Sequence, residues 1–371
     1  MAAWFRTKPS FRRLGPLAGI ALALLLAGCG AASPPASARP PTNGATSAAP
    51  ASVQPLSPPV HLKVGVNQTL SESGLYIGLE KGYFRDEGLE VELTTLPSIQ
   101  DMVPVLATGA LDIGSGGLVP AVFNAINRGA GLRVVTIATF YAAGYDPALV
   151  ARKDLVDGGQ LKNYSDLRGK SYATTTANVS VFNMAYERAL ELGGVSREDA
   201  KNVNLSFPDM VTALANKGID LAFLPEPFAT AAVDKAAGVR WRQVGEILPD
   251  QPASMWVYSQ KLVESQPEAG RRYMAALLRG ARDYEEAFKK NKGRPEAVAA
   301  LAKYTSIKDP ALYDKIAPVK LALSGEVPLD KLKSTLEWFK ERGALERVPD
   351  VNTVAESQFS AYAVSRLGPY R

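Results

Sequence analysis

Apolar and polar positions follow one order along the chain, and that order occurs twice. Residues 62–67 and 170–175 are short, mostly apolar runs typical of buried strands. Each is followed by a stretch with helical spacing that ends on glycine, at 73–88 and at 181–194. Alternating runs at 91–97 and 202–208 then stop at a proline. The pattern predicts a strand, a helix and a second strand in each half.

A repeated phrase extends each unit. "DMVPVLATGALDIGSGG" begins at Asp101, and "DMVTALANKGIDLAFLPEPF" begins 108 positions later, at Asp209. Each copy predicts a helix opened by an aspartate, which suits the positive end of the helix dipole, and then a strand near Asp112 or Asp220. Because the same offset aligns the preceding elements, we interpret the halves as a duplicated α/β unit; chance recurrence of a helix–strand pair is the alternative.

The order of elements predicts an α/β fold with mostly parallel sheets covered by helices on both faces. The part after about Ser259 is mostly helical in pattern, as in residues 267–290 and 329–343. Sheets of this kind bind ligands beyond the carboxyl ends of their strands, where the two copies diverge. We therefore expect the shared phrase to form the scaffold of each unit. The segments after Asp112 and Asp220 are expected to form two different walls of one cleft.

Four loops at these strand ends carry short polar side chains or glycine. Such groups offer hydrogen bonds near helix N-termini, although helix capping and tight turns also use them. A carboxylate in the fourth loop is expected either to accept a hydrogen bond from a ligand or to cap the next helix. The predicted ligand contacts in the loops are Gln68, Ser71, Ser73, Ser115, Gly116, Thr175, Thr176, Asn178, Ser180 and Glu226.

Aromatic residues lie near two further segments, around residues 140–150 and 251–259. Phe140, Tyr141, Tyr145 and Trp256 offer flat faces on which a ring stacks, although packing between segments is the alternative use. We include Tyr141 and Trp256 among the predicted ligand contacts. Since no arginine or lysine occurs in the four loops, the pattern favours a neutral, ring-bearing solute over a strongly anionic one.

The first 60 residues differ from the rest. A basic segment and an apolar run from Leu14 to Leu26 predict a signal peptide over 1–28, because the run is short for a membrane span. The end of the run, "LAGC", resembles the bacterial lipobox, which implies lipidation at Cys29; an ordinary signal peptide is the alternative. Residues 29–60 include eight prolines and one charge, which predicts a disordered tether.

Charge and residue counts exclude several classes of function. The net charge is +5, and all five surplus basic residues precede His61, so no basic stripe predicts nucleic-acid binding. One cysteine and one histidine exclude an intramolecular disulfide, a histidine metal site and a Ser–His or Cys–His catalytic pair in the cleft. We therefore expect a monomer that is not an enzyme and has no cofactor or metal.

The motifs over residues 60–290 resemble a known family. Gly82-Tyr83-Phe84 with Gly88-Leu89, the stretch Leu106–Gly114, "LRGK" from Leu167, and Glu226-Pro227-Phe228 resemble the solute-binding proteins of ABC importers for sulfonates, taurine, nitrate and thiamine-pyrimidine precursors. The resemblance implies a two-lobed periplasmic-binding-protein fold, in which two crossing strands join the lobes. It places the first lobe at 61–142 with 250–371 and the second at 143–249.

The resemblance also implies a function. A protein of this group captures a small molecule outside the cytoplasm by lobe closure and delivers it to an ABC permease and its ATPase, here from a lipid anchor in the membrane. We expect a ring-bearing vitamin precursor such as a thiamine pyrimidine; a sulfonate, taurine or nitrate is the alternative. A receptor for a sensor kinase is a further alternative, and so is an enzyme, because the group also resembles a eukaryotic thiamine-pyrimidine synthase.

Overall fold

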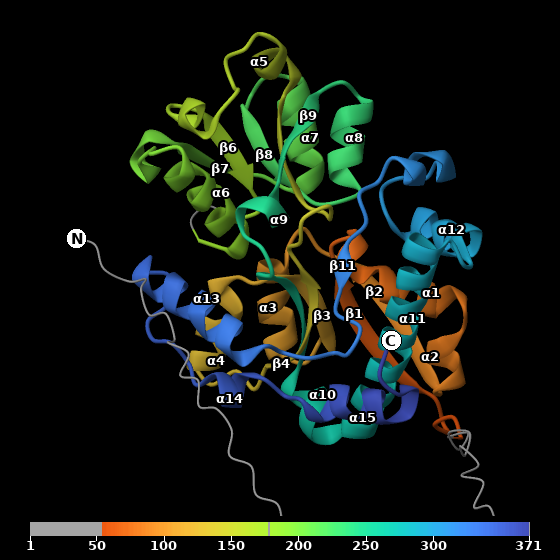
Figure 1. Ribbon diagram of the computed structural model, residues 1–371. Helices are drawn as coiled ribbons and strands as arrows, with labels where there is room; N and C mark the ends of the chain where they lie inside the picture. Colours follow the sequence, from red (N-terminus) through yellow and green to blue (C-terminus); the bar gives the residue numbers. More distant parts are fainter. Residues whose placement is uncertain (1–53, 177–178, 371) are drawn as a thin grey trace, which may run out of the picture. The chain divides into compact units, whose positions relative to one another are not determined.

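The computed structural model describes residues 54–176 and 179–370 (Figure 1). The predicted signal peptide, the lipidation site Cys29 and the predicted ligand contact Asn178 lie outside the described residues. The described residues belong to one unit, Pro50–Arg371, and contain two β-sheets. No helix among them is long and apolar enough to cross a membrane.

The first lobe is built on a six-stranded sheet with the order β11-β4-β10-β3-β1-β2. β1 pairs parallel with β2 and β3, whereas β10 runs antiparallel between β3 and β4. Every residue of β10 is buried, as expected for a central strand. The strands are β1 Val60–Val66, β2 Leu89–Thr95, β3 Ile113–Gly117, β4 Arg133–Phe140, β10 Pro252–Tyr258 and β11 Lys320–Leu321.

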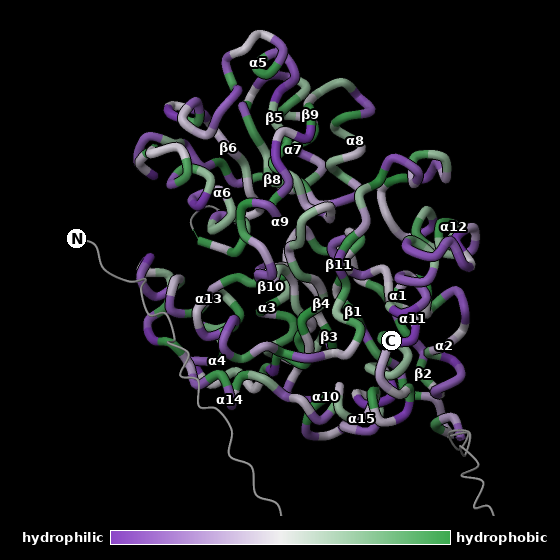
Figure 2. The backbone as a smooth tube through the Cα atoms, viewed as in Figure 1, coloured by the Kyte–Doolittle hydropathy of each residue, from purple (hydrophilic) through white to green (hydrophobic). Residues whose placement is uncertain are grey.

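The second lobe is built on a five-stranded sheet with the order β7-β6-β8-β5-β9. β6 pairs parallel with β7 and β8, and β5 runs antiparallel between β8 and β9. Hydrophobic colouring appears within both sheets in Figure 2, in keeping with the fully buried Leu221–Leu224 of β8. The strands are β5 Ala148–Arg152, β6 Ser171–Thr174, β7 Lys201–Asn204, β8 Leu221–Leu224 and β9 Gly238–Gln243.

Helices flank both sheets (Figure 1). Those of the first lobe are α1 Ser73–Glu80, α2 Tyr83–Asp86, α3 Ile99–Ala107, α4 Pro120–Asn127, α10 Gln260–Ser265, α11 Pro267–Lys290, α12 Arg294–Tyr304, α13 Leu329–Glu341, α14 Val351–Val354 and α15 Gln358–Leu367. Those of the second are α5 Lys153–Asp157, α6 Val181–Leu192, α7 Phe207–Ala215, α8 Phe228–Asp234 and α9 Val244–Ile247. Short 3₁₀ turns occur at Leu70–Glu72, Tyr164–Leu167, Arg197–Asp199 and Pro310–Asp314.

The predicted duplication is confirmed. α3 and α7 begin 108 positions apart, and so do β3 and β8. One hydrogen bond also recurs at this offset: the Lys63 N–H donates to Asp112 at 2.9 Å, and the Ser171 N–H donates to Asp220 at 2.9 Å. Each repeated aspartate thus ties the start of its third strand to its first strand. These residues are scaffold.

Two segments, 141–147 and 248–251, connect the lobes. The Tyr141 N–H donates to the Gln251 carbonyl at 2.9 Å, and the Asp250 N–H donates to the Tyr141 carbonyl at 2.8 Å. The two crossings therefore pair with each other, as the two-lobed fold requires.

The tether was expected to extend to residue 60, but residues 54–59 are held against the first lobe. The Leu56 N–H donates to the Glu87 carbonyl at 3.2 Å, and the Arg272 guanidinium donates to the Gln54 carbonyl at 2.5 Å. Gly88 has φ +75°, and a side chain there would meet the Leu56 backbone at 2.2 Å. Backbone contacts of this kind leave no hydrophobic pattern in the sequence, so the prediction missed them.

Candidate functional site

A pocket lies between the two sheets, with about 590 Å³ of space not filled by protein atoms, part of it open to solvent. It is formed where β1, β3, β6 and β8 end, so its walls come from both lobes and from the first crossing. The described residues that line it are Asn67, Thr69, Ser71, Glu72, Pro97, Ser98, Ile99, Gly116, Gly117, Val119, Thr139, Tyr141, Asp146, Pro147, Thr175, Phe182, Phe207, Phe223, Pro225, Ala253, Ser254 and Val319.

Glu72 is the charged group of the first lobe's wall. Its fully buried carboxylate accepts hydrogen bonds from the Thr69 N–H at 2.9 Å, the Thr69 hydroxyl at 2.8 Å and the Ser115 hydroxyl at 3.1 Å. Thr69 and Glu72 form a capping box, which explains their spacing locally. Burial raises the pKa of the Glu72 carboxyl above its ordinary value, while the hydrogen bonds oppose the rise.

Asp146, in the first crossing, is the second acid of the pocket. It is 7% exposed and accepts a hydrogen bond from the Glu226 N–H at 2.7 Å. Burial, followed by repulsion from the Glu226 carboxylate, raises the pKa of Asp146 well above its ordinary value. The pocket therefore combines two buried acids, and no lysine or arginine is among the described residues that line it.

Three phenylalanines make up most of the second lobe's wall. The Phe182 and Phe223 rings stack with centroids 4.5 Å apart, and the Phe182 and Phe207 rings lie edge to face at 6.2 Å. Tyr141 adds a ring at 6.1 Å from Phe223, and its buried hydroxyl has no hydrogen-bond partner among the described residues. This wall offers aromatic faces and one unused hydroxyl.

The lobes contact each other around the pocket. The Val181 N–H donates to the Leu118 carbonyl at 3.1 Å, and the Leu70 N–H donates to the Glu226 carbonyl at 3.0 Å. Phe182 packs against Gly117, where a side-chain carbon would lie 2.3 Å from the ring. Glycine at this position thus permits the close approach, and the structure has the lobes in a closed arrangement.

Four predicted ligand contacts line the pocket: Ser71, Gly116, Tyr141 and Thr175. Gly116 does so from a different element than expected, because Ile113–Gly117 is the buried strand β3 rather than a loop. Its glycine is required by packing, since a side chain would meet Ile99 at 2.7 Å and Asn67 at 2.9 Å. The predicted loop was therefore wrong.

Other predicted contacts support the lining without belonging to it. The Ser115 hydroxyl donates to the Glu72 carboxylate at 3.1 Å, and the Ser73 hydroxyl donates to the Leu70 carbonyl at 2.6 Å. Gln68 has a left-handed backbone, with φ +59°, and also lies outside the lining.

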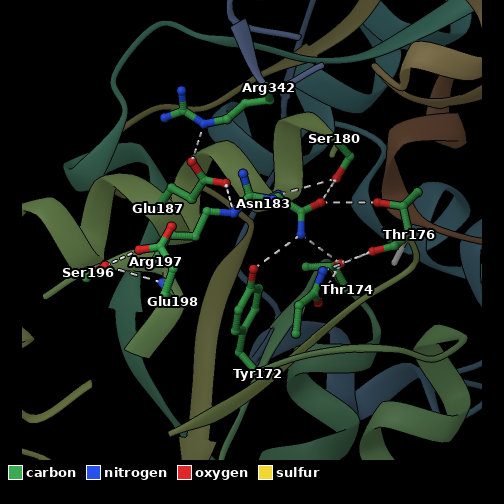
Figure 3. A network of polar contacts seen from close by, with 11 residues as sticks. Tyr172, Thr174, Thr176, Ser180, Asn183, Glu187, Ser196, Arg197, Glu198 and Arg342 are labelled. Carbon is green, nitrogen blue, oxygen red and sulfur yellow. Dashed lines mark hydrogen bonds and ion pairs between the residues drawn. The ribbon is translucent and has the colours of Figure 1, made fainter. Parts of the chain in front are cut away.

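Thr176 and Ser180 belong to a buried network at the start of α6 (Figure 3). Their hydroxyls donate to the Asn183 side-chain oxygen at 3.1 Å and 2.6 Å. The Asn183 amide group in turn donates to the Thr174 hydroxyl at 3.3 Å. The network holds Thr174 and Thr176, which flank Thr175. Thr176 is therefore explained by this network, and Ser180 by its role as the N-cap of α6.

Glu226 does not line the pocket. Its carboxylate is fully buried, accepts the Thr230 N–H at 3.0 Å, and lies 2.5 Å from the Arg240 guanidinium. The expected ligand contact is therefore replaced by the helix-capping alternative, reinforced by an arginine 14 residues away in sequence. Trp256 is also placed elsewhere: it is 2% exposed and packs against Tyr273 in the core of the first lobe.

Sequence reasoning missed the most distinctive lining residues. Phe182, Phe207 and Phe223 lie in segments with helix or strand patterns, and an aromatic residue in such a pattern predicts a buried core position and not a ligand contact. Asp146 precedes a proline in a crossing that no motif marks. Glu72 carried a usable signal, the spacing Thr69-x-x-Glu72, but that spacing predicts a capping box rather than a pocket.

A family model and solved structures match this chain. The model of the NMT1-like family matches residues 56–303. No curated protein sequence matches the chain significantly.

Three solved structures are similar to the chain. The alkanesulfonate-binding protein SsuA from Xanthomonas axonopodis pv. citri, bound to MOPS, is 17% identical, with a TM-score of 0.65 over 81% of this chain and 100% of that one. The periplasmic nitrate-binding protein NrtA from Synechocystis PCC 6803 is 15% identical, with a TM-score of 0.68 over 84% and 89%. The desulfurization enzyme DSZB is 14% identical, with a TM-score of 0.61 over 83% and 99%. These likenesses show the two-lobed fold.

Proposed function

The chain belongs to the NMT1-like family, and from that premise we propose that it is the extracytoplasmic solute-binding component of an ABC importer. Its solute would bind between the lobes and be delivered to a permease and its ATPase. The observation that carries this proposal is the pocket itself, whose walls come from both lobes and from the crossing that joins them. A pocket divided in this way assembles only when the lobes close.

The solute we propose carries a ring, as a thiamine pyrimidine does. The stacked rings of Phe182 and Phe223, with Phe207 beside them, offer flat apolar contacts, while Ser71 and Thr175 offer hydroxyls. Small polar solutes without a ring would leave most of this wall unused.

A sulfonate, taurine or nitrate is the alternative, supported by two of the similar structures, whose names give an alkanesulfonate and nitrate as ligands. An anion here would depend on hydroxyls and helix N-termini, since no basic side chain is among the described lining residues. A receptor for a sensor kinase would use the same pocket and closure, and the genes encoded beside this one distinguish it from an importer.

We propose no catalytic role, although one similar structure is an enzyme. The single histidine, His61, is 76% exposed at its side chain and pairs with Glu90, so it does not meet the pocket. A histidine that lined the pocket would be the first candidate for a general base, and His61 does not line it. We also propose that Cys29 is lipidated and anchors the protein; mass spectrometry of the wild-type chain and its Cys29→Ala variant tests this.

The test of solute capture uses the full chain. A thermal-shift screen with aminopyrimidines, flavins, sulfonates, taurine and nitrate identifies the compound that stabilises the protein, and calorimetry should give one site per chain. Closure on that compound should lower the radius of gyration measured by small-angle scattering. A saturated complex as expanded as the free protein would contradict capture by closure.

A further inference from the structure

The charge of the pocket is unusually one-sided. Among the described lining residues, Glu72 and Asp146 are acidic and none is basic. Both side chains are more than nine-tenths buried. A carboxylate removed from water is costly unless a cation or enough hydrogen-bond donors replace the lost hydration. The partners that each acid already has therefore decide what a solute must supply.

Glu72 has neutral partners. Its three donors are the Thr69 N–H, the Thr69 hydroxyl and the Ser115 hydroxyl, at 2.8 to 3.1 Å. They satisfy lone pairs but leave the negative charge uncompensated. No ion pair of Glu72 exists among the described residues.

Asp146 shares one cation with a second acid. The Arg240 guanidinium is 2.5 Å from Glu226, and it also donates to the Thr230 hydroxyl. Asp146 receives a hydrogen bond from the Glu226 N–H instead. When both carboxyls are ionised, one guanidinium balances only one of them, and Asp146, which lines the pocket, has no ion pair of its own among the described residues.

The opposite wall is suited to a cation as well. Aromatic faces attract positive charge through the ring quadrupole, and Phe182, Phe207 and Phe223 present three rings to the pocket. Tyr141 lines the same pocket with a hydroxyl that has no partner among the described residues, although the residue is 1% exposed. This hydroxyl is therefore available to a ligand that enters the pocket.

We infer that the solute carries a positively charged nitrogen next to an aromatic ring, with Glu72 and Asp146 pairing with the nitrogen and the phenylalanines packing on the ring. This inference rests on the proposed function and adds the solute's charge to it. The direction of the pKa shifts agrees, because burial raises the pKa of both carboxyls and neither has a cation of its own to oppose that rise fully. A bound cation would favour the ionised form of each carboxyl.

The test compares three probes that share one ring and differ in charge: benzylammonium, benzyl alcohol and phenylmethanesulfonate. Calorimetry at pH 7.5 on the full chain measures each affinity, and scattering records whether the lobes close. Benzylammonium should bind at least tenfold more tightly than benzyl alcohol, because the alcohol offers the ring without the charge. Phenylmethanesulfonate should bind most weakly of the three.

Glu72→Gln and Asp146→Asn test the acids separately. Each keeps the side chain's shape and one acceptor oxygen, and glutamine is also accepted in a capping box. Each variant should weaken benzylammonium by tenfold or more and leave benzyl alcohol within about twofold, which a merely structural role would not do. The matched control is Glu285→Gln, a buried acid on α11 that pairs with Lys289 outside the pocket; it should leave the order and the affinities unchanged.

The outcomes separate this inference from the proposed function. If the sulfonate or the alcohol binds tightest and closes the lobes, the charge assignment is wrong and solute capture stands. If both pocket variants keep the wild-type preference for benzylammonium, the two acids do not set the charge and the inference fails. If none of the three probes binds at millimolar concentration, the ring-bearing solute fails together with its charge.

Discussion

The two lobes repeat one scaffold but give the pocket opposite walls. At positions 108 residues apart, Ile99 and Ser115 of the first lobe are replaced by Phe207 and Phe223 in the second. Glu72 of the first lobe corresponds to Ser180 of the second. The described lining residues of the first lobe include hydroxyls and a carboxylate but no aromatic ring, whereas the second wall is aromatic. A duplicated unit has kept its strands and diversified the side chains at their ends.

The lobes also differ at the carboxyl end of the third strand of the repeat. β3 ends in glycine and allows Phe182 of the other lobe to approach, whereas β8 is succeeded by Pro225 and Glu226, beside Asp146 and Arg240. One strand end is thus built for close approach and the other for buried charge. Two changes test this contrast.

Arg240→Met should have the largest effect, because it leaves Glu226 and Asp146 buried without a cation. Removing one partner of a buried ion pair costs about 3 to 5 kcal/mol, and we expect about 3 because the Arg240 side chain is 25% exposed. Urea unfolding of the full chain measures the loss. The pKa of Asp146 is raised in the folded protein, so the free energy of unfolding falls as the pH rises through that pKa. The loss caused by Arg240→Met should therefore be larger at pH 8 than at pH 5.

The control for Arg240→Met removes one acid together with the cation. Arg240→Met with Glu226→Gln restores the charge balance beside Asp146, while glutamine still accepts from the Thr230 N–H. The double variant should recover more than half of the lost stability. Equal losses in the single and double variants would mean that Arg240 stabilises the lobe by packing and not by its charge.

Gly117→Ala should have the next largest effect, and on binding instead of stability. The added carbon would lie 2.3 Å from the Phe182 ring, so the lobes could not reach the closed arrangement. Overpacking costs about 1 to 3 kcal/mol, and the upper part of that range weakens affinity roughly 100-fold. Calorimetry with benzylammonium, or with the compound found by the screen, measures the loss, and scattering should show less contraction.

Two variants check the steric cause. Gly218→Ala is the matched control, since its nearest neighbours would lie 3.6 Å or more from the added carbon, at ordinary contact distance. Gly117→Ala combined with Phe182→Leu shortens the opposing side chain and should regain part of the affinity relative to Phe182→Leu alone. Normal binding by Gly117→Ala would show that the Phe182 contact is not part of the liganded state.

The scaffold could be predicted from the sequence because its signals are local. Apolar runs, glycine stops and the aspartates in the first turns of α3 and α7 are each signals within a few residues, and the 108-residue offset shows that they recur together. The pocket depends instead on pairs distant in sequence. Glu226 is held at the helix by its ion pair with Arg240 on β9. Hydrophobic periodicity in the sequence does not indicate such a pairing.

The same reason explains the error at residues 113–117. Glycines in "IGSGG" indicate a turn when only neighbours are considered, yet here they form a buried strand whose missing side chains admit Ile99 and Phe182. Ser71 and Thr175 were predicted as ligand contacts because each lies in a polar stretch between a predicted strand and the helix that follows it. The aromatic wall was missed because phenylalanines in core patterns are ordinary.

The smallest effects should come from the aspartates that the two copies share. Asp112 accepts the Lys63 N–H and lies 2.9 Å from the Lys261 ammonium. Asp220 accepts the N–H and the hydroxyl of Ser171, and lies 3.2 Å from the Arg152 guanidinium. The two sites have equivalent roles, each joining the first and third strands of its unit and pairing with a cation from a neighbouring segment.

Asp112→Asn and Asp220→Asn should each destabilise the chain by about 1 kcal/mol, because one acceptor remains for the strand N–H while the charge opposite the cation is lost. Asp220→Asn should cost slightly more, since Arg152 is 15% exposed and Lys261 is 49% exposed at their side chains. The control Asp157→Asn breaks an exposed pair with Lys153 and should change stability by less than about 0.5 kcal/mol in the same urea unfolding. Neither scaffold variant should change solute affinity, because neither residue lines the pocket. A tenfold loss of affinity in either one, as expected for Asp146→Asn, would mean that the repeated aspartates belong to the site and that the division between shared scaffold and divergent wall is wrong.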